Sequence, residues 1–249
     1  MASCEKDHLP QNPSKLINGV SMDRFSQVCD NFIDFQVPNQ TLEEVSSVLK
    51  NGANIALVTN HQSYFEIEAI RYFCQRLNQV SEKPIPSVLF YSAPAVESNT
   101  KFLLETRLPI YRQHGLILLP IIRQVDKTNK YQECITPEMR SQTRKSLQLY
   151  ADTIKQGGCL LIHPFELTLQ GGRLNLMTGE INGIQPNKEA SLVSLIKSGF
   201  YFLPCGVDGS YKVINPDNNQ PSCDFIKALN NIPSSNQPVS FRTCLLYTS

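Results

Sequence analysis

The sequence lacks any run of about eighteen apolar residues, which is the length that a membrane-spanning helix needs. Its longest apolar run near the middle, LILLPII, is shorter and is interrupted by Pro120. We also find no signal peptide, no internal repeat and no low-complexity segment. These absences predict a chain that has neither a transmembrane helix nor a secretory leader.

A C-x-x-C pair, the spacing expected of a zinc or redox motif, is also missing among the eight cysteines. We therefore interpret the cysteines as reduced core or surface residues of an intracellular protein. An excess of one charge is lacking too, because 23 Lys and Arg residues face 22 Asp and Glu residues. This balance argues against bulk attraction to nucleic acid, but it leaves room for a local anion site.

The two ends of the chain differ in composition from its middle. Residues 1–20 open with the polar segment MASCEKDHLPQNPSK, which predicts a disordered lead without the Arg- and Ser-rich, acid-poor character of a transit peptide. Residues 242–249, RTCLLYTS, resemble translated sequencing-adapter read-through. We expect them to be a non-native tail, and we expect the natural chain to continue beyond them.

Residues 21–52 carry the pattern of a short helical pair. Apolar residues recur at helical spacing over 22–36, which predicts the first helix. The second is expected over 41–50, where Thr41 and Glu44 have the spacing of a capping box and Gly52 ends the helix.

From residue 53 to residue 241 the pattern changes to alternating strands and helices. We expect strands at 54–59, 86–92, 115–122, 159–163 and 200–207, and helices at 62–78, 99–106, 136–156 and 188–198. Such an order predicts an α/β domain with a largely parallel, mixed central sheet flanked by helices. Pro120 places its strand at an edge or a bulge. Because ligands sit at the carboxyl ends of parallel strands, His61 and the loops after Ile162 and Val207 should border one crevice.

His61 is the sharpest candidate for chemistry, because it follows a strand directly and opens a helix. Glu66 lies five residues later, about one and a half helical turns away, so its carboxylate can return to the imidazole. A carboxylate on one ring nitrogen fixes the tautomer and leaves the other nitrogen as a base for an alcohol. The alternative is a histidine that only caps the following helix.

The segment NHQSYFE resembles the first signature block of the glycerolipid acyltransferase superfamily. The resemblance makes His61 and Glu66 the catalytic pair, with Asn60 and Ser63 supporting it. The acid of that block is usually Asp, and Glu66 is one methylene longer. Glu68 is the weaker substitute, because it projects about 200° around the helix from Glu66.

The second block of that family is an apolar strand that ends in arginine, and GLILLPIIR fits it with Arg123 at its end. The resemblance implies that Arg123 holds a substrate phosphate, since a guanidinium binds phosphate through two hydrogen bonds. Lys127 and Lys130 follow and could add to the anion site. The alternative is a solvated basic turn after a strand.

The third block is matched loosely by IHPFELTLQGGR. Glu166 and Thr168 stand for the usual Glu and Thr, and Arg173, after a Gly-Gly pair that is otherwise an ordinary turn, is the second candidate phosphate ligand. His163 is either a further polar group of the crevice or a strand-end histidine that is satisfied locally. The fourth block is matched by FYFLPCGVDGSY, where Pro204 would shape the acyl-binding wall.

The four blocks occur in family order over residues 54–214, and they most resemble the soluble, plastid-type glycerol-3-phosphate acyltransferases. The resemblance implies transfer of a fatty acyl group from acyl carrier protein or acyl-CoA to glycerol 3-phosphate, which gives lysophosphatidate, without a metal or other cofactor. It implies a place in the cytoplasm or plastid stroma, with room for peripheral membrane contact. Two alternatives are a lysophosphatidate or other lysophospholipid acyltransferase, and a catalytically degenerate member that binds lipid or a partner.

Overall fold

The computed structural model of the chain describes residues 29–30, 33–60, 66–82, 84–94, 107–123, 127, 132–165, 193–208 and 239–243. The elements in chain order are β1 (Ile33–Gln36), α2 (Asn39–Lys50), β2 (Ile55–Asn60), α3 (Glu66–Val80), β3 (Ser87–Ser92), β4 (Leu116–Ile121), η3 (Gln132–Cys134), α5 (Pro137–Lys155), β5 (Cys159–Phe165), β6 (Tyr201–Asp208) and β7 (Val239–Thr243). Residues 107–113 and 193–197 are also helical.

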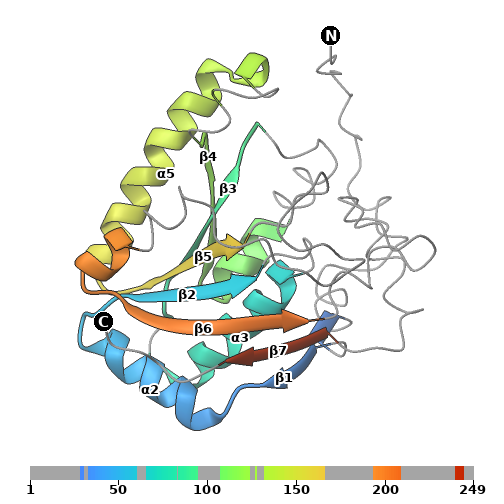
Figure 1. Cartoon of the computed structure of the whole chain (residues 1–249), viewed down its shortest axis with the longest axis vertical. Coiled ribbons are helices and arrows are strands. Elements are labelled where there is room, and N and C mark those ends of the chain that lie inside the picture. Colours follow the sequence, from blue (N-terminus) through green and yellow to red (C-terminus); the bar gives the residue numbers. More distant parts are fainter. Residues whose placement is uncertain are drawn as a thin grey trace, which may run out of the picture.

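The strands of the described residues form one seven-stranded sheet in the order β1-β7-β6-β2-β5-β3-β4 (Figure 1). The five strands from β6 to β4 run parallel to one another. β7 is antiparallel to β6, and β1 is parallel to β7, so the sheet is mixed. This architecture confirms the predicted α/β class.

Side chains of the central strands alternate between the two faces of the sheet, as the two-residue period of a strand requires. In β2, Ile55 and Leu57 belong to one buried cluster, whereas Ala56 belongs to a second cluster. β5 alternates in the same way, with Leu161 in the first cluster and Leu160 in the second. The central strands are therefore buried on both faces, which explains why their sequences are continuous apolar runs.

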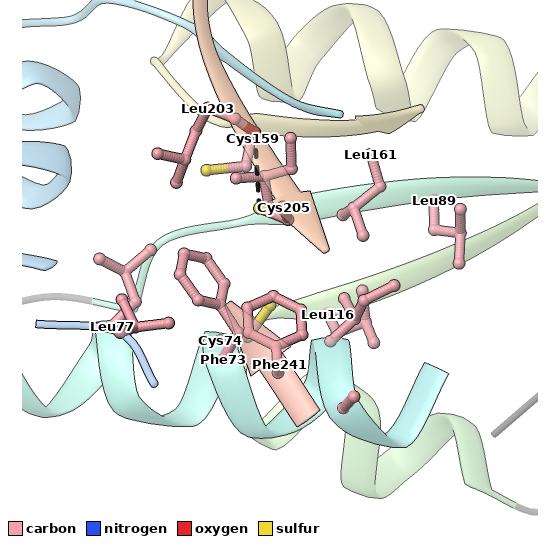
Figure 2. Close-up of a cluster of buried hydrophobic side chains, with 14 of the residues drawn as sticks. Phe73, Cys74, Leu77, Leu89, Leu116, Cys159, Leu161, Leu203, Cys205 and Phe241 are labelled. Carbon is pink, nitrogen blue, oxygen red and sulfur yellow. Dashed lines mark hydrogen bonds between the residues drawn. The ribbon is translucent and has the colours of Figure 1, made fainter. Parts of the chain in front are cut away.

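Helices cover both faces of this sheet (Figure 1). α2 and α3 contribute to the larger cluster, which also contains side chains from β2 to β7. Figure 2 shows that Phe73 and Leu77 of α3 point toward Phe241 of β7 and the side chains of the central strands. On the other face, Tyr150 and Ile154 of α5 pack against the second cluster.

Most of the expected elements are present, with shifts of a few residues at their ends. Strands occur at each of the five predicted positions, and β4 lies at the edge of the sheet, as Pro120 indicated. The helix predicted over 22–36 is wrong at its end, because Ile33–Gln36 form β1. The capping box is also wrong: α2 begins at Asn39, its N-cap residue is Pro38, and Thr41 is buried within the first turn.

The sheet also extends beyond the residues that we assigned to the α/β domain. β1 precedes residue 53, and β7 includes Arg242 and Thr243, the first two residues of the expected tail. Within the described part of the chain, no helix is long and apolar enough to cross a membrane.

The state of the cysteines agrees only in part with the expectation. Cys29, Cys74, Cys159 and Cys205 are free and buried. Cys134 is disulfide-bonded, so the expectation of reduced cysteines is wrong at this position.

Candidate functional site

The carboxyl ends of the five parallel strands meet at one edge of the sheet, which we call the carboxyl edge. β2 is central there and ends at Asn60, and α3 begins at Glu66. Five residues separate the two elements in the sequence. The side chain of Asn60 and residues 61–65, which include His61 and Ser63, lie outside the described residues.

The pairing of β2 with β5 becomes irregular at this point. Val58 is opposite Ile162, but Asn60 is opposite Phe165, so β5 has one more residue than β2 over this interval. The extra residue falls at His163 or Pro164. Bulges of this kind bend a strand and redirect side chains, and they are common beside active sites. His163 is partly buried here.

Glu66 is the first residue of α3, and its side chain is almost fully buried, with 1% of its surface exposed. The first turn of a helix favours a carboxylate, because the free backbone N–H groups give that end a partial positive charge. Glu66 thus lies after β2 at the carboxyl edge, at the start of α3, and its predicted relation to His61 falls outside the described residues.

Arg123 follows the carboxyl end of β4, so it lies at the carboxyl edge, and it is partly buried. The backbone N–H of its neighbour Ile122 donates a hydrogen bond of 3.0 Å to the hydroxyl of Thr143 on α5, which fixes the chain at this exit. β5 and β3 lie between β2 and β4, so three strand spacings, about 14 Å, separate the ends of β2 and β4. The Arg123 side chain, a side chain from the β2 end and a substrate held between them would together have to span this distance.

Two further candidate residues lie in the described part of the chain. Lys127 is exposed, and it is the one residue that the structure describes between Arg123 and Gln132. Pro204 lies in β6 opposite Val58 of β2, and the pairing of β7 with β6 begins one residue later, at Cys205. Pro204 thus lies in the middle of β6, next to β2, with Cys205–Asp208 between it and the carboxyl end of its strand. Lys130, Glu166, Thr168 and Arg173 lie outside the described residues.

A buried network of charged side chains lies on the same first turns of α3. Glu68 is fully buried, and its Oε1 and Oε2 accept hydrogen bonds of 2.9 and 2.8 Å from Nη2 of Arg107, which is also buried. The hydroxyl of Tyr111 donates to Oε1 over 2.7 Å, and Nε of Arg71 donates to Oε2 over 2.9 Å. Arg71 also pairs with the half-buried Asp30.

The network is neutral as a whole, because two arginines face two carboxylates. Burial alone would raise the pKa of Glu68, but Arg107 and Arg71 outweigh it and hold the pKa below its ordinary value. Burial, followed by the Glu68 carboxylate, raises the pKa of Tyr111 well above its usual range. At neutral pH, Glu68 is therefore ionised and Tyr111 keeps the proton that it donates.

Sequence reasoning missed this network. Glu68 was considered only as a substitute for Glu66, and Arg71, Arg107 and Tyr111 were not considered. The available signals were the spacing of Glu68 and Arg71 at i, i+3 and of Arg107 and Tyr111 at i, i+4. Because exposed helices carry the same spacings, no pattern in the sequence marks these side chains as buried.

Comparison with known proteins adds no assignment. Neither a scan against protein-family models nor a search of curated proteins gives a match to this chain. Among the described residues, no group of three or more His, Cys, Asp or Glu side chains is placed to hold a metal ion.

Proposed function

We propose that this chain is an O-acyltransferase that moves a fatty acyl group from an acyl-CoA or acyl carrier protein thioester to glycerol 3-phosphate. The observation that carries the proposal is the succession of β2 and α3 at the carboxyl edge. There, β2 ends at Asn60, α3 begins at the buried Glu66, and the intervening segment holds His61. This is the position at which parallel α/β sheets place their ligands.

In the proposed reaction, Glu66 orients the imidazole of His61, which takes the proton from a hydroxyl of glycerol 3-phosphate. The oxygen attacks the thioester carbonyl and forms a tetrahedral intermediate. Collapse of this intermediate breaks the carbon–sulfur bond, and the departing thiolate takes the proton from His61. The products are lysophosphatidate and the free thiol of the carrier.

The phosphate of the acceptor needs fixed cations, which the proposal assigns to Arg123 and Arg173, with Lys127 or Lys130 assisting. A guanidinium is suited to this task because its N–H groups match the spacing of phosphate oxygens. The separation of about 14 Å between the ends of β2 and β4 is the main geometric demand on this assignment. Arg123→Ala should therefore raise the KM for glycerol 3-phosphate more than the KM for the donor.

The test uses the purified full chain with palmitoyl-CoA or palmitoyl-acyl carrier protein as donor and glycerol 3-phosphate as acceptor. Thiol release and lysophosphatidate formation are followed together. We expect His61→Ala to lower kcat by about 10²–10⁴-fold, the usual contribution of positioned proton transfer. Glu66→Gln should also lower kcat strongly, whereas Glu66→Asp should retain activity because it keeps the carboxylate.

Two matched variants control for the substitutions themselves. His8→Ala removes a histidine of the polar lead, and Glu43→Gln removes an exposed carboxylate on α2. Both should leave kcat within about two-fold of the original. A folded His61→Ala protein with full activity would refute the proposal. Turnover with lysophosphatidate but not glycerol 3-phosphate as acceptor would favour the lysophospholipid acyltransferase, and thioester binding without turnover would favour a degenerate member.

A further inference from the structure

The Glu68 network is unusual because it buries three ionised groups, Glu68, Arg71 and Arg107, and a phenol where apolar side chains could pack. Removing a charge from water is costly, and a buried ion pair often contributes no more stability than apolar residues of the same size. Its hydrogen bonds are directional, however, so they fix the relative position of the segments that they join. The network therefore fixes the relative position of these segments more than it stabilises the fold.

The Glu68 carboxylate is held from two sides. Arg107 and Tyr111 lie one turn apart on the helical residues 107–113 and both donate to it, while Arg71 donates from the next turn of α3. Oε1 thus has three donors, Nε and Nη2 of Arg107 and the Tyr111 hydroxyl, and Oε2 has two, Nη2 of Arg107 and Nε of Arg71. The guanidinium of Arg107 binds both carboxylate oxygens of Glu68. Because of this, α3 can neither slide nor rotate against residues 107–113 without breaking several hydrogen bonds.

The same turn of α3 carries Glu66, two residues before Glu68 and on a different side of the helix. A helix turn moves as a rigid unit, so a shift of Glu68 also displaces Glu66. Displacement of a catalytic group by about 1 Å can lower a rate by about 100-fold. The contacts of Glu68 thereby set where the Glu66 carboxylate lies at the carboxyl edge.

We propose that Arg107 and Tyr111 are positioning residues of this protein, which fix the first turn of α3 through Glu68 and so place Glu66 for catalysis. This inference rests on the proposed function as far as catalysis is concerned. The effect of the network on the position of the first turn of α3 does not depend on the proposed function. It can be measured without an assay of enzymatic activity.

The test compares Tyr111→Phe and Arg107→Lys with the original protein. Tyr111→Phe keeps the ring and removes one hydrogen bond to Glu68. Arg107→Lys keeps the positive charge but loses the guanidinium that hydrogen-bonds both carboxylate oxygens. Tyr150→Phe is the matched control, since it removes a phenol hydroxyl from α5 on the opposite face of the sheet. Val88→Ala, in the core beneath α5, is the control for lost stability alone.

We expect amide hydrogen exchange in residues 66–71 to speed up by about 10-fold or more in both network variants, with residues 73–80 little changed. With palmitoyl-CoA and glycerol 3-phosphate, kcat should fall by about 10-fold while both KM values stay within about two-fold. Tyr150→Phe should behave like the original. Val88→Ala should lower Tm by a similar amount without lowering kcat.

The outcomes separate the two proposals. Uniform exchange along α3, or a loss of kcat no larger than in Val88→Ala at equal Tm, overturns the positioning role. If the original protein has no acyltransferase activity, the proposed function fails, and the exchange pattern alone decides whether the network fixes the first turn. If Arg107→Lys does not fold, the milder Tyr111→Phe still gives both readouts.

Discussion

Gly115 is a residue whose backbone leaves no room for a side chain. Its φ angle is +79°, in the left-handed region, and a Cβ atom there would lie 2.5 Å from the carbonyl oxygen of Ile85. That neighbour is backbone and cannot move aside cheaply, because Ile85 also donates its N–H to the amide oxygen of Asn78. Gly115 thus closes the turn before β4 at the amino ends of β3 and β4.

We predict that Gly115→Ala lowers the free energy of unfolding by about 2–5 kcal/mol, through left-handed strain plus steric overlap. Two other glycines separate these contributions. Gly199 has φ +71° but open space around it, so Gly199→Ala should cost about 1–2 kcal/mol. Gly206 has neither constraint, so Gly206→Ala should change stability by at most about 0.5 kcal/mol. Urea denaturation measures all three, and equal effects would contradict this account.

At the scale of single residues, the sequence predicted positions better than environments. Glu66 was expected in the helix that follows the strand at 54–59, and it is the first residue of that helix. The burial of Glu68 and Arg71 was not predictable, because the residues that enclose them, Arg107 and Tyr111, are about forty positions away in the chain. Local spacing specifies which side of a helix a residue occupies, but not what packs against that side.

At the scale of elements, α5 shows how local signals define a helix. Thr136 is its N-cap residue, and the Thr136 hydroxyl accepts a hydrogen bond of 3.3 Å from the backbone N–H of Met139. Pro137 occupies the first helical position, where its missing N–H costs nothing. The predicted span of 136–156 agrees with the observed helix to within one residue at each end.

We predict that Thr136→Ala destabilises the protein by about 1 kcal/mol, because it leaves one N–H of the first turn without its partner. Thr136→Ser should retain most of the stability, since it keeps the accepting oxygen. Gln142→Ala, at an exposed position of the same helix, controls for substitution on α5. Thermal unfolding followed by circular dichroism provides the measurement. A loss for Thr136→Ser as large as that for Thr136→Ala would show that the oxygen is not the cause.

The N-terminal elements show where such local signals mislead. Residues 22–36 carry helical spacing, yet Ile33 and Phe35 lie in a four-residue strand. A strand this short has little pattern of its own, and its partner β7 lies about two hundred residues later. Similarly, Thr41 and Glu44 have capping-box spacing, but α2 starts two residues earlier, directly after Pro38. In both cases, tertiary packing outweighed a weak local preference.

At the scale of the whole molecule, the sheet combines parallel and antiparallel strand pairs. The parallel strands from β6 to β4 form the centre and bring their carboxyl ends to one edge. β7 and β1 extend the sheet on the far side of β6 and join residues 33–36 to residues 239–243. The candidate site lies on the parallel strands. β7 and β1 contribute buried side chains to the core cluster beneath α2 and α3.

Phe241 of β7 is the residue through which this pair of strands contributes to the core. It is 1% exposed, its ring stacks on Phe35 of β1 at 5.8 Å, and it lies 5.5 Å from the ring of Phe73 in α3. The three rings thus join segments from the beginning, the middle and the end of the described chain. Aromatic groups of this size dominate the energetics of a core.

We predict that Phe241→Ala lowers the free energy of unfolding by about 3–5 kcal/mol, the usual cost of an emptied aromatic site. Its neighbour Arg242 is exposed in the same strand, so Arg242→Ala should cost about 0.5 kcal/mol or less. Urea unfolding curves provide the comparison, and ring-current shifts of Phe35 by NMR report whether β1 stays in place. If both variants cost the same, β7 does not contribute to the core, and the parallel strands with their carboxyl edge must be stable without it.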